Sequence, residues 1–539
     1  MEALFSNTAD DNTATGYQAL YANTTGVYNT ANGAYALPNN TTGTNNTAVG
    51  FFALHDNLVG GFNTAVGVDA LFRNKASGNT ALGTSALASN ASGSNNTAVG
   101  VSSLYYNNAA FNTATGFGAM FFHTTGDNNT ANGANALKGN VNQLLNTGAN
   151  NTATGANALV ENTSGNNNSA FGTSSLFSNR ANSRSTAIGF GAMQNADDRA
   201  TGRETFNTAV GFEALKGSAT PANNIGLSNT AVGDRVLWSN ENGNFNTGLG
   251  AGTLLKNTTG AYNTATGANT LPENTSGHNN TASGASVLLA NNTGYFNTAM
   301  GNNALVRNTS GYGNTSMGMN SLRNNVSGFY NTAIGAGADV AAPGLTNATA
   351  VGYSATATAN NQIRLGNGAV TEVLPGSNCL ATLGNAASKW KEVWACNGVI
   401  QTSDSRLKSG ISKINYGLNE VMSMRPVQYY WKDNSEQGRI LGFVAQDMES
   451  IVPESVVAPK NEEEYYAMKY DALIPVLTKA IQEQQDQIEA LKLQNAQLGV
   501  LAQQNQSLQT QLDEMRAEMQ AFRAAIGGKV SESKSNSEK

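Results

Sequence analysis

The residues NTATGANTLPENTSGHN at 263–279 set the architecture of this chain, because close copies of them fill most of its length. Residues 46–62 read NTAVGFFALHDNLVGGF, and residues 297–313 read NTAMGNNALVRNTSGYG. The shared unit is N-T-A-x-G-x-x-A-L-x-x-N-T-x-G-x-x, a period of 17 residues that recurs about twenty times. Such a period is the signature of a repeat protein, in which each unit packs on its neighbours.

Two positions of the unit indicate how the coil folds. Position five is glycine, from Gly16, Gly33 and Gly50 through to Gly352, which predicts a positive φ or a close backbone approach. Position nine is leucine or methionine in almost every copy, and the residue before the glycine is usually Val, Ile, Leu, Met or Thr. We expect both of these apolar positions to face the interior.

A unit of 17 residues is too short for a helix hairpin and suits one coil of a parallel β-solenoid. Stacked coils place leucine on leucine and asparagine on asparagine, so the column Asn12, Asn29, Asn46 predicts an amide ladder. We therefore predict a mainly β chain in which residues 1–365 form a β-solenoid or β-roll shaft. Twenty coils at strand spacing span roughly 100 Å.

The shaft has local irregularities and no visible metal site. Two repeat intervals shrink to 16 residues, and three grow to 22, at 129–151, 185–207 and 207–229. His55, His123 and His278 fall at different offsets, so they form no metal-ligand column, and we predict neither metal nor cofactor. Scattered Phe and Tyr residues favour packing between coils. A rigid spacer is the preferred interpretation, and a receptor-binding surface is the alternative.

Composition excludes two classes of function. The net charge is −6 and the pI is about 5.3, which argues against nucleic-acid binding. No apolar run is long enough to insert into a membrane. Cys379 and Cys396 are too few for a disulfide scaffold, and whether they pair stays open.

The repeats resemble the head repeats of trimeric autotransporter adhesins over about 12–365, although the coil in that family is usually shorter. The resemblance implies a homotrimer of parallel solenoids. Thin, Ala-rich coils bury little surface in one chain, which independently favours lateral association. The start, MEALFSNT at 1–8, matches the second half of a repeat rather than a signal peptide. We expect the sequence to begin within a repeat and an upstream anchor or secretion signal to be missing.

A second resemblance lies after residue 400. TSDSRLK at 402–408 resembles the S-D-x-R-x-K signature of the intramolecular chaperone auto-processing domain, peptidase family S74 of endosialidase type. That family occurs at the C-termini of phage tail fibres, tail-spike endosialidases and myelin regulatory factors. Three further blocks, at 417–433, 442–456 and 466–481, resemble the same domain. The resemblance implies cleavage between Thr402 and Ser403, with Asp404, Arg406 and Gln446 as family motif residues.

The chemistry of such a cut requires a serine with a base beside it. A hydroxyl becomes nucleophilic when a neighbouring amine takes its proton, and a lysine does so once desolvation lowers its pKa. Ser403 and Lys408 are the candidate catalytic pair: Ser403 would attack the carbonyl of Thr402, and water would hydrolyse the ester. Residues five apart lie about 140° apart around a helix, so a turn or a trimer contact must join them. The reaction is at most one turnover of the chain on itself.

Beyond residue 470 the sequence predicts a long helix with a heptad seam. The predicted trimer core consists of Ile474, Leu477, Ile481, Ile488, Leu491, Asn495 and Asn505. The two asparagines at core positions would lower the stability of the coiled coil but fix the alignment of its chains. The heptad pattern changes phase after Leu498. A single amphipathic helix packed on a globular domain is the alternative. We place the coiled coil at 476–527 and a disordered tail at 528–539.

These observations predict a shaft at 1–365, a neck at 366–402, a small α+β chaperone domain at 403–475 and a C-terminal trimeric coiled coil. The predicted function is a homotrimeric fibre, of tail-fibre or adhesin type, on the outside of a cell or virion. Its partner would be a cell-surface receptor or glycan. One alternative is a cell-surface trimeric adhesin held by the missing N-terminal segment. Another is a glycan-degrading tail spike, which needs a carboxylate pair, whereas acidic residues before 402 are few and scattered.

Overall fold

The computed structural model describes residues 2–374, 383, 403–432, 438–459 and 464–531, with side chains described as far as 526. Most of the predicted neck and both cysteines lie outside the described residues. The chain divides into two compact units, Met1–Val373 and Leu374–Lys539, which are described separately.

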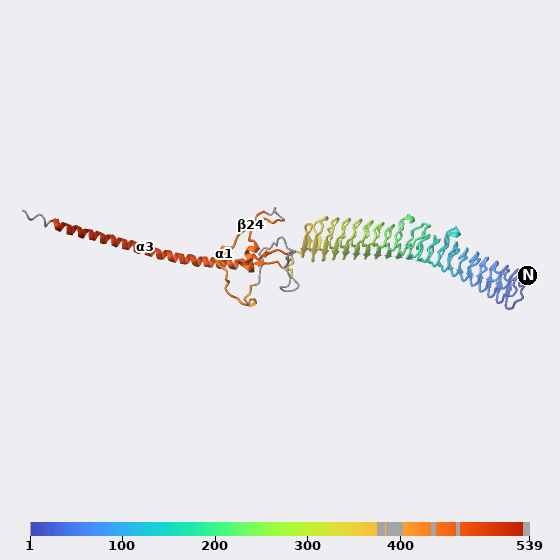
Figure 1. The fold of residues 1–539 in the computed structure, drawn as a ribbon. Helices are drawn as coiled ribbons and strands as arrows, with labels where there is room; N and C mark the ends of the chain where they lie inside the picture. Colours follow the sequence, from blue (N-terminus) through green and yellow to red (C-terminus); the bar gives the residue numbers. More distant parts are fainter. Residues whose placement is uncertain (1, 375–382, 384–402, 433–437, 460–463, 532–539) are drawn as a thin grey trace, which may run out of the picture. The chain divides into compact units, whose positions relative to one another are not determined.

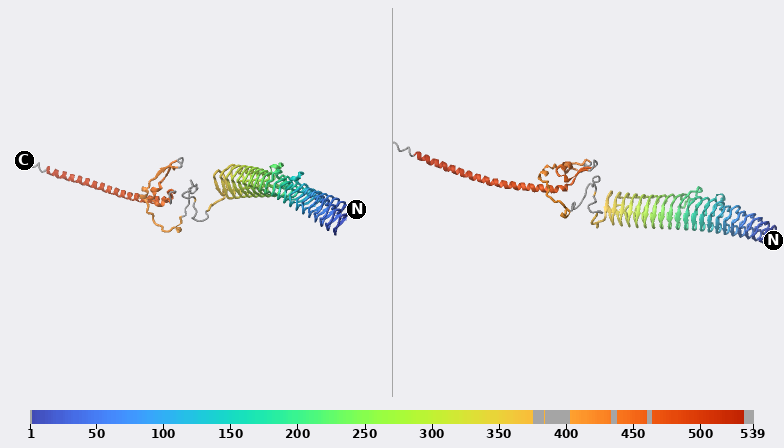
Figure 2. Two further views of the ribbon diagram at one scale, coloured as in Figure 1. Left: turned by 45° about the vertical axis from the view of Figure 1, so that its right-hand side comes forward. Right: turned by 60° about the horizontal axis from the view of Figure 1, so that its bottom comes forward.

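The first unit is a parallel β-solenoid in which each coil contributes one short strand to a single 21-stranded sheet (Figures 1 and 2). Neighbouring strands pair in parallel with a shift of one repeat, as in Thr264↔Thr281 and Ala265↔Ala282. The mainly β, parallel solenoid predicted from the repeat is confirmed. The strands are β1 (Thr13–Thr15), β2 (Thr30–Asn32), β3 (Thr47–Val49), β4 (Thr64–Val66), β5 (Thr80–Leu82), β6 (Thr97–Val99), β7 (Thr113–Thr115), β8 (Thr130–Asn132), β9 (Thr152–Thr154), β10 (Ser169–Phe171), β11 (Thr186–Ile188), β12 (Thr208–Val210), β13 (Thr230–Val232), β14 (Thr247–Leu249), β15 (Thr264–Thr266), β16 (Thr281–Ser283), β17 (Thr298–Met300), β18 (Thr315–Met317), β19 (Thr332–Ile334), β21 (Thr349–Val351) and β23 (Ile363–Leu365).

Smaller elements complete this unit. Strands β20 (Asp339–Val340) and β22 (Thr356–Ala357) form a second parallel pair near its end. Two 3-10 turns, η1 (Gln143–Leu145) and η2 (Pro221–Asn223), lie in coils that are five residues longer than the standard repeat.

The core of the solenoid is made of alanine and leucine. The middle residue of nearly every strand is a buried alanine such as Ala265, and the leucines of position nine are buried as predicted. The prediction that the residue before the glycine faces inward is wrong: Thr266 and Met300 are exposed. Side chains alternate along a strand, so an inward position three forces position four outward. Small alanine side chains therefore make the coil thin.

The glycine of position five meets both predicted requirements. Gly267 has a φ of +120°, and a Cβ there would lie 2.3 Å from the carbonyl oxygen of Gly284 in the next coil. Three other positions also adopt positive φ without glycine, as at Asn269 (+50°), Leu271 (+52°) and Asn279 (+56°). A left-handed leucine is strained. The backbone N–H of Leu271 donates to the carbonyl of Val287 at 3.0 Å, and the Leu271 side chain is fully buried. This hydrogen bond and this burial offset the strain.

Two asparagine columns form amide ladders through the core. In the position-one ladder, the backbone N–H and Nδ2 of Asn280 donate to Oδ1 of Asn263 at 3.0 and 3.1 Å. In the position-twelve ladder, Nδ2 of Asn291 donates to Oδ1 of Asn274 at 2.8 Å. Both ladders also donate to the carbonyl of Gly294, at 2.9 and 3.1 Å. The amide ladder predicted from the first column is confirmed, and the second ladder was not predicted.

Aromatic side chains stack from coil to coil. The rings of Tyr295 and Tyr312, and of Tyr312 and Phe329, lie 4.8 Å apart and are nearly parallel. This distance equals the spacing of paired strands. The interpretation of these aromatics as packing between coils is confirmed.

The second unit contains a small α+β body and a long helix (Figure 1). Its short helices are η3 (Ser405–Leu407), α1 (Leu418–Ser423), α2 (Ala445–Glu449), η5 (Pro453–Ser455) and η6 (Tyr470–Ala472). Strands β24 (Val427–Tyr429) and β25 (Ile440–Gly442) pair antiparallel, as do β26 (Val456–Val457) and β27 (Ala467–Met468). Helix α3 (Leu473–Ser531) runs past the predicted end at 527.

Replacing Gly267 with valine should lower the stability of the shaft by about 1–3 kcal/mol per chain, because the positive φ is strained for any other residue. The Cβ also meets the backbone of the next coil, whereas Thr266→Val at the adjacent exposed position should have little effect. Thermal unfolding followed by circular dichroism measures both. Equal shifts in the two variants would contradict the stacking described for position five.

Candidate self-processing site

A single turn brings the predicted serine and lysine together. Residues 405–407 form the 3-10 turn η3, and Nζ of Lys408 donates to Oγ of Ser403 at 2.6 Å. Both side chains are exposed in the single chain. The contact satisfies the distance requirement for proton transfer between hydroxyl and amine. Thr402, on the other side of the predicted cut, lies outside the described residues.

Asp404 and Arg406 hold the turn that joins the pair. The Asp404 carboxylate caps η3 by accepting the backbone N–H of Arg406 at 2.8 Å. It also accepts the Arg406 guanidinium, at 2.6 Å from Nη2. These hydrogen bonds from Arg406 hold the pKa of Asp404 below its ordinary value. The two family motif residues therefore position the backbone between Ser403 and Lys408.

A small apolar core supports the body behind this turn. Met424, Met448, Val452, Leu473 and Val476 pack together, joining α1 and α2 to the start of α3. Gln446, the third family motif residue, is exposed on α2, an element separate from the serine–lysine turn.

A carboxylate from α3 holds the start of helix α1. The sequence analysis did not predict this contact. Oε2 of Glu483 accepts the backbone N–H of Leu418 at 2.8 Å, and Lys479 lies 3.4 Å from Oε1. The backbone hydrogen bond lowers the pKa of Glu483. A helix N-terminus has free N–H groups that favour an anion, so this contact couples the body to the long helix. Glu483 is 65 residues from Leu418, and no local pattern announces such a pair.

Comparison with protein families identifies this part of the chain. Residues 403–457 match the family described as the chaperone of endosialidase, peptidase S74. The match begins at Ser403 and covers the turn, α1, β24, β25, α2 and η5. Together with the shaft of 17-residue repeats, this endosialidase-type chaperone segment fits a tail-fibre-like protein. The chain has no significant match among curated proteins.

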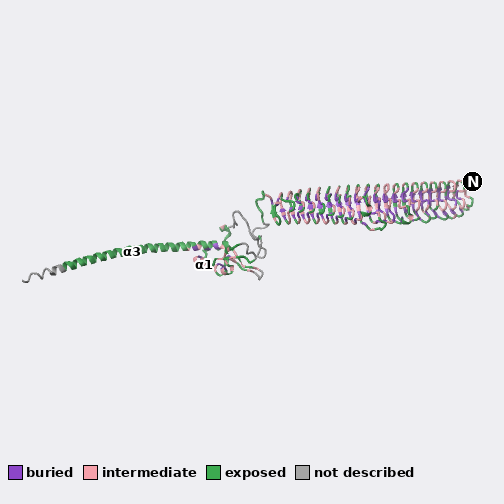
Figure 3. Cartoon of the chain, turned by 90° about the horizontal axis from the view of Figure 1, so that it is seen from above, coloured by how far each residue is buried: buried purple, intermediate pink, exposed green. Residues whose placement is uncertain are grey.

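Helix α3 leaves its apolar seam exposed in the single chain (Figure 3). The predicted core residues Ile474, Leu477, Ile481, Ile488, Leu491, Asn495 and Asn505 are all exposed. Within the described residues, no helix has the length and apolar character needed to cross a membrane.

Glu483→Gln should loosen α1, because the amide replaces a charged acceptor of the Leu418 N–H with a weaker one. The folded pKa of Glu483 is lowered, so the contribution is present above the unfolded pKa and is lost as the pH falls through the folded value. Hydrogen exchange of the Leu418 amide, measured from neutral to acid pH, tests this. Exchange in the wild type should approach that of the variant only at acid pH. The control is Glu489→Gln on the same helix, which should leave this amide unchanged.

Proposed function

We propose that this protein is a homotrimeric extracellular fibre whose C-terminal segment acts as an intramolecular chaperone and then separates by self-cleavage. The observation that carries the proposal is the endosialidase-type chaperone segment, which lies in the chain between a β-solenoid and a helix with an exposed apolar seam. The predicted division into shaft, neck, chaperone domain and coiled coil is part of this proposal.

The exposed seam of α3 supports association of several copies. Apolar residues at heptad spacing along an isolated helix leave a stripe that water solvates poorly. A coiled coil buries that stripe and holds the copies parallel and in register. Asn495 and Asn505 then serve as buried polar positions that select register and strand number.

The strand face of the shaft supports lateral contact between copies. In about half of the coils the side chain at position four is apolar and 36–44% exposed; examples are Ile188, Val232, Leu249, Met300 and Ile334. Exposed apolar side chains that repeat once per coil pack best against a partner surface whose side chains repeat at the same distance. A second copy of the same solenoid has that spacing. The proposed trimer therefore completes a core that the thin coil lacks.

Self-cleavage would proceed through the Ser403–Lys408 pair. A neutral Lys408 takes the hydroxyl proton as Oγ attacks the Thr402 carbonyl carbon, and the same proton passes to the departing amine of Ser403. The ester that joins Thr402 to Oγ then reacts with water, leaving a carboxylate at Thr402 and a free hydroxyl at Ser403. Burial of the exposed lysine by neighbouring copies would favour its neutral form and delay cleavage until assembly.

The proposed role of the mature shaft is attachment to a cell-surface receptor or glycan. A tail fibre and a cell-surface adhesin share this arrangement, and an upstream segment would distinguish them. A glycan-degrading spike has less support, because acidic residues before 402 are few and scattered in the sequence. Glu213, for example, is engaged by Lys216 and Trp238 rather than by a second acid.

Ser403→Ala and Lys408→Ala should each leave a full-length chain, because one lacks the nucleophile and the other lacks the base. Ser405→Ala, in the same turn, is the matched control and should still be cut. Mass spectrometry of freshly assembled protein should find a fragment that begins at Ser403. An intact wild-type chain after prolonged incubation of a verified trimer would refute cleavage.

Removal of residues 403–539 before synthesis should give a misassembled shaft, because parallel pairing of many near-identical coils is slow and permits slipped registers. Light scattering and electron microscopy of 1–402, compared with the full chain carrying Ser403→Ala, measure this. A soluble, well-formed trimer of 1–402 expressed alone would contradict the chaperone role.

A further inference from the structure

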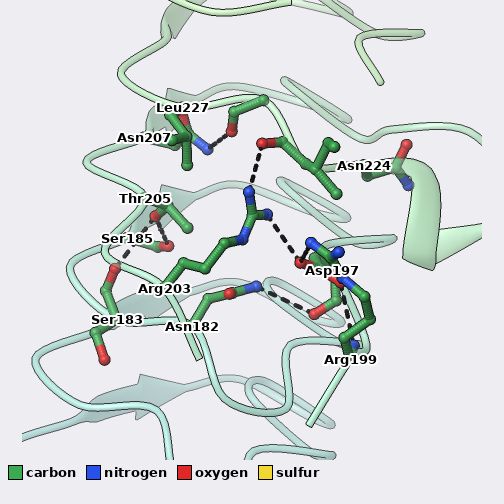
Figure 4. Close-up of polar contacts among 12 residues, drawn as sticks. Asn182, Ser183, Ser185, Asp197, Arg199, Arg203, Thr205, Asn207, Asn224 and Leu227 are labelled. Carbon is green, nitrogen blue, oxygen red and sulfur yellow. Dashed lines mark hydrogen bonds and ion pairs between the residues drawn. The ribbon is translucent and has the colours of Figure 1, made fainter. Parts of the chain in front are cut away.

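The position-twelve ladder is interrupted in the middle of the shaft. It stops after Asn179 and resumes at Asn240, because Ala196 and Ser218 occupy the two positions between them. The position-one ladder also changes here. Ser185 replaces the asparagine, and its hydroxyl forms a hydrogen bond with Thr205 at 2.7 Å (Figure 4).

The interruption leaves two buried oxygens without partners in the protein. Oδ1 of Asn179 and Oδ1 of Asn182 have no hydrogen bond, although these residues are at most 1% exposed. In the intact ladder, Asn274 Oδ1 accepts from Asn291. Turning the two amides over would not solve the problem, because Asn179 Nδ2 already donates to Asn162 and Asn182 Nδ2 to the carbonyl of Asp197, both at 3.1 Å. An unpaired buried acceptor costs free energy, so a donor is required.

A cavity of about 30 Å³ lies at the same place. Its lining includes Asn179, Asn182, Asn207 and Asn240. Position fifteen, where most coils have glycine, is Asn182 in this coil, and the position-twelve asparagine of the next coil is replaced by the small Ala196. A space of this size with several polar partners is large enough to hold a water molecule.

The charges around the cavity argue against a bound cation. The Asp197 side chain is 2% exposed, and its carboxylate accepts hydrogen bonds from Arg199 and Arg203 at 2.8 Å each (Figure 4). Two guanidinium groups therefore neutralise the one buried acid. Nε of Arg203 is also buried without a partner, and as a donor it cannot ligate a cation. A metal ion would have no uncompensated negative charge to bind.

We infer that this cavity is a hydration site in which an ordered water takes the place of the first missing rung, the one at Ala196 that would have donated to Asn179. Its two O–H groups donate to Oδ1 of Asn179 and Oδ1 of Asn182. Nδ2 of Asn207, which also lines the cavity, donates one bond, to the carbonyl of Gly226, so this amide retains a second N–H for the water oxygen. The site requires no partner chain, so it stands independently of the proposed assembly.

The test is a structure of the full-length protein at a resolution that shows ordered water, together with Ala196→Asn. The wild type should show a peak within hydrogen-bonding distance of both orphan oxygens. In the variant, the new amide should donate to Asn179, the peak should disappear, and the melting temperature should rise. Asn291→Ala is the reciprocal control: it opens a gap in the intact ladder and should lower the melting temperature.

A second variant protects the test against a failure of Ala196→Asn to fold. Asn182→Gly restores the residue that most coils have at this position, so the coil should fold, and the water should lose one of its two acceptors and become weaker in the map. An empty cavity in the wild type would overturn the inference. So would a peak with ligand distances of about 2.3–2.6 Å that changes when the salt cation is exchanged, since this geometry indicates a bound metal ion. A peak unchanged by either variant would also contradict it.

Discussion

Hydrogen bonding from each coil to the next, at the same sequence position, is the constraint on which the shaft depends. Each strand of the 21-stranded sheet has only three residues, too few to be stable alone, so the backbone and both asparagine ladders must repeat in register. This requirement explains why the sequence is so uniform. It explains the glycine at position fifteen, where Gly294 accepts from both ladders and a Cβ would lie 2.3 Å from the Asn291 amide oxygen.

The same constraint accounts for what the sequence could and could not predict. The period, the parallel pairing, the glycine at position five and the buried leucine follow from residues that recur at fixed spacing. The inward residue of the strand was misjudged, because Val, Leu and Met at position four look like core residues. Alternation from Thr264 instead turns Ala265 inward and Thr266 outward. The left-handed leucines, such as Leu271, follow from the closed path of the coil, which no single residue encodes.

In the chaperone segment, the sequence predicted a local contact but not a contact between distant residues. Motif resemblance pointed to Ser403 and Lys408, and ideal helix geometry required either a turn or a trimer contact to join them. Turn η3 places the two side chains in contact within one chain. The contact between Glu483 and Leu418 joins residues far apart in the sequence, and the carboxylate is one of many along α3. Local patterns predict local geometry, whereas pairs between distant elements depend on packing that only the folded chain defines.

Uniform repetition stabilises the shaft, but it also leaves the register between coils poorly specified. If one segment slipped by a whole coil, leucine would still meet leucine, and most amide bonds would re-form. The long coils that begin at 129, 185 and 207 break this equivalence, because their added residues have no counterpart in a coil of standard length. Asn179 lacks a ladder bond beside the coil that begins at 185, and in that coil the buried Asp197 pairs with Arg203. A local loss of ladder bonds is therefore compatible with a gain in specificity of register, as polar groups provide in other regular assemblies.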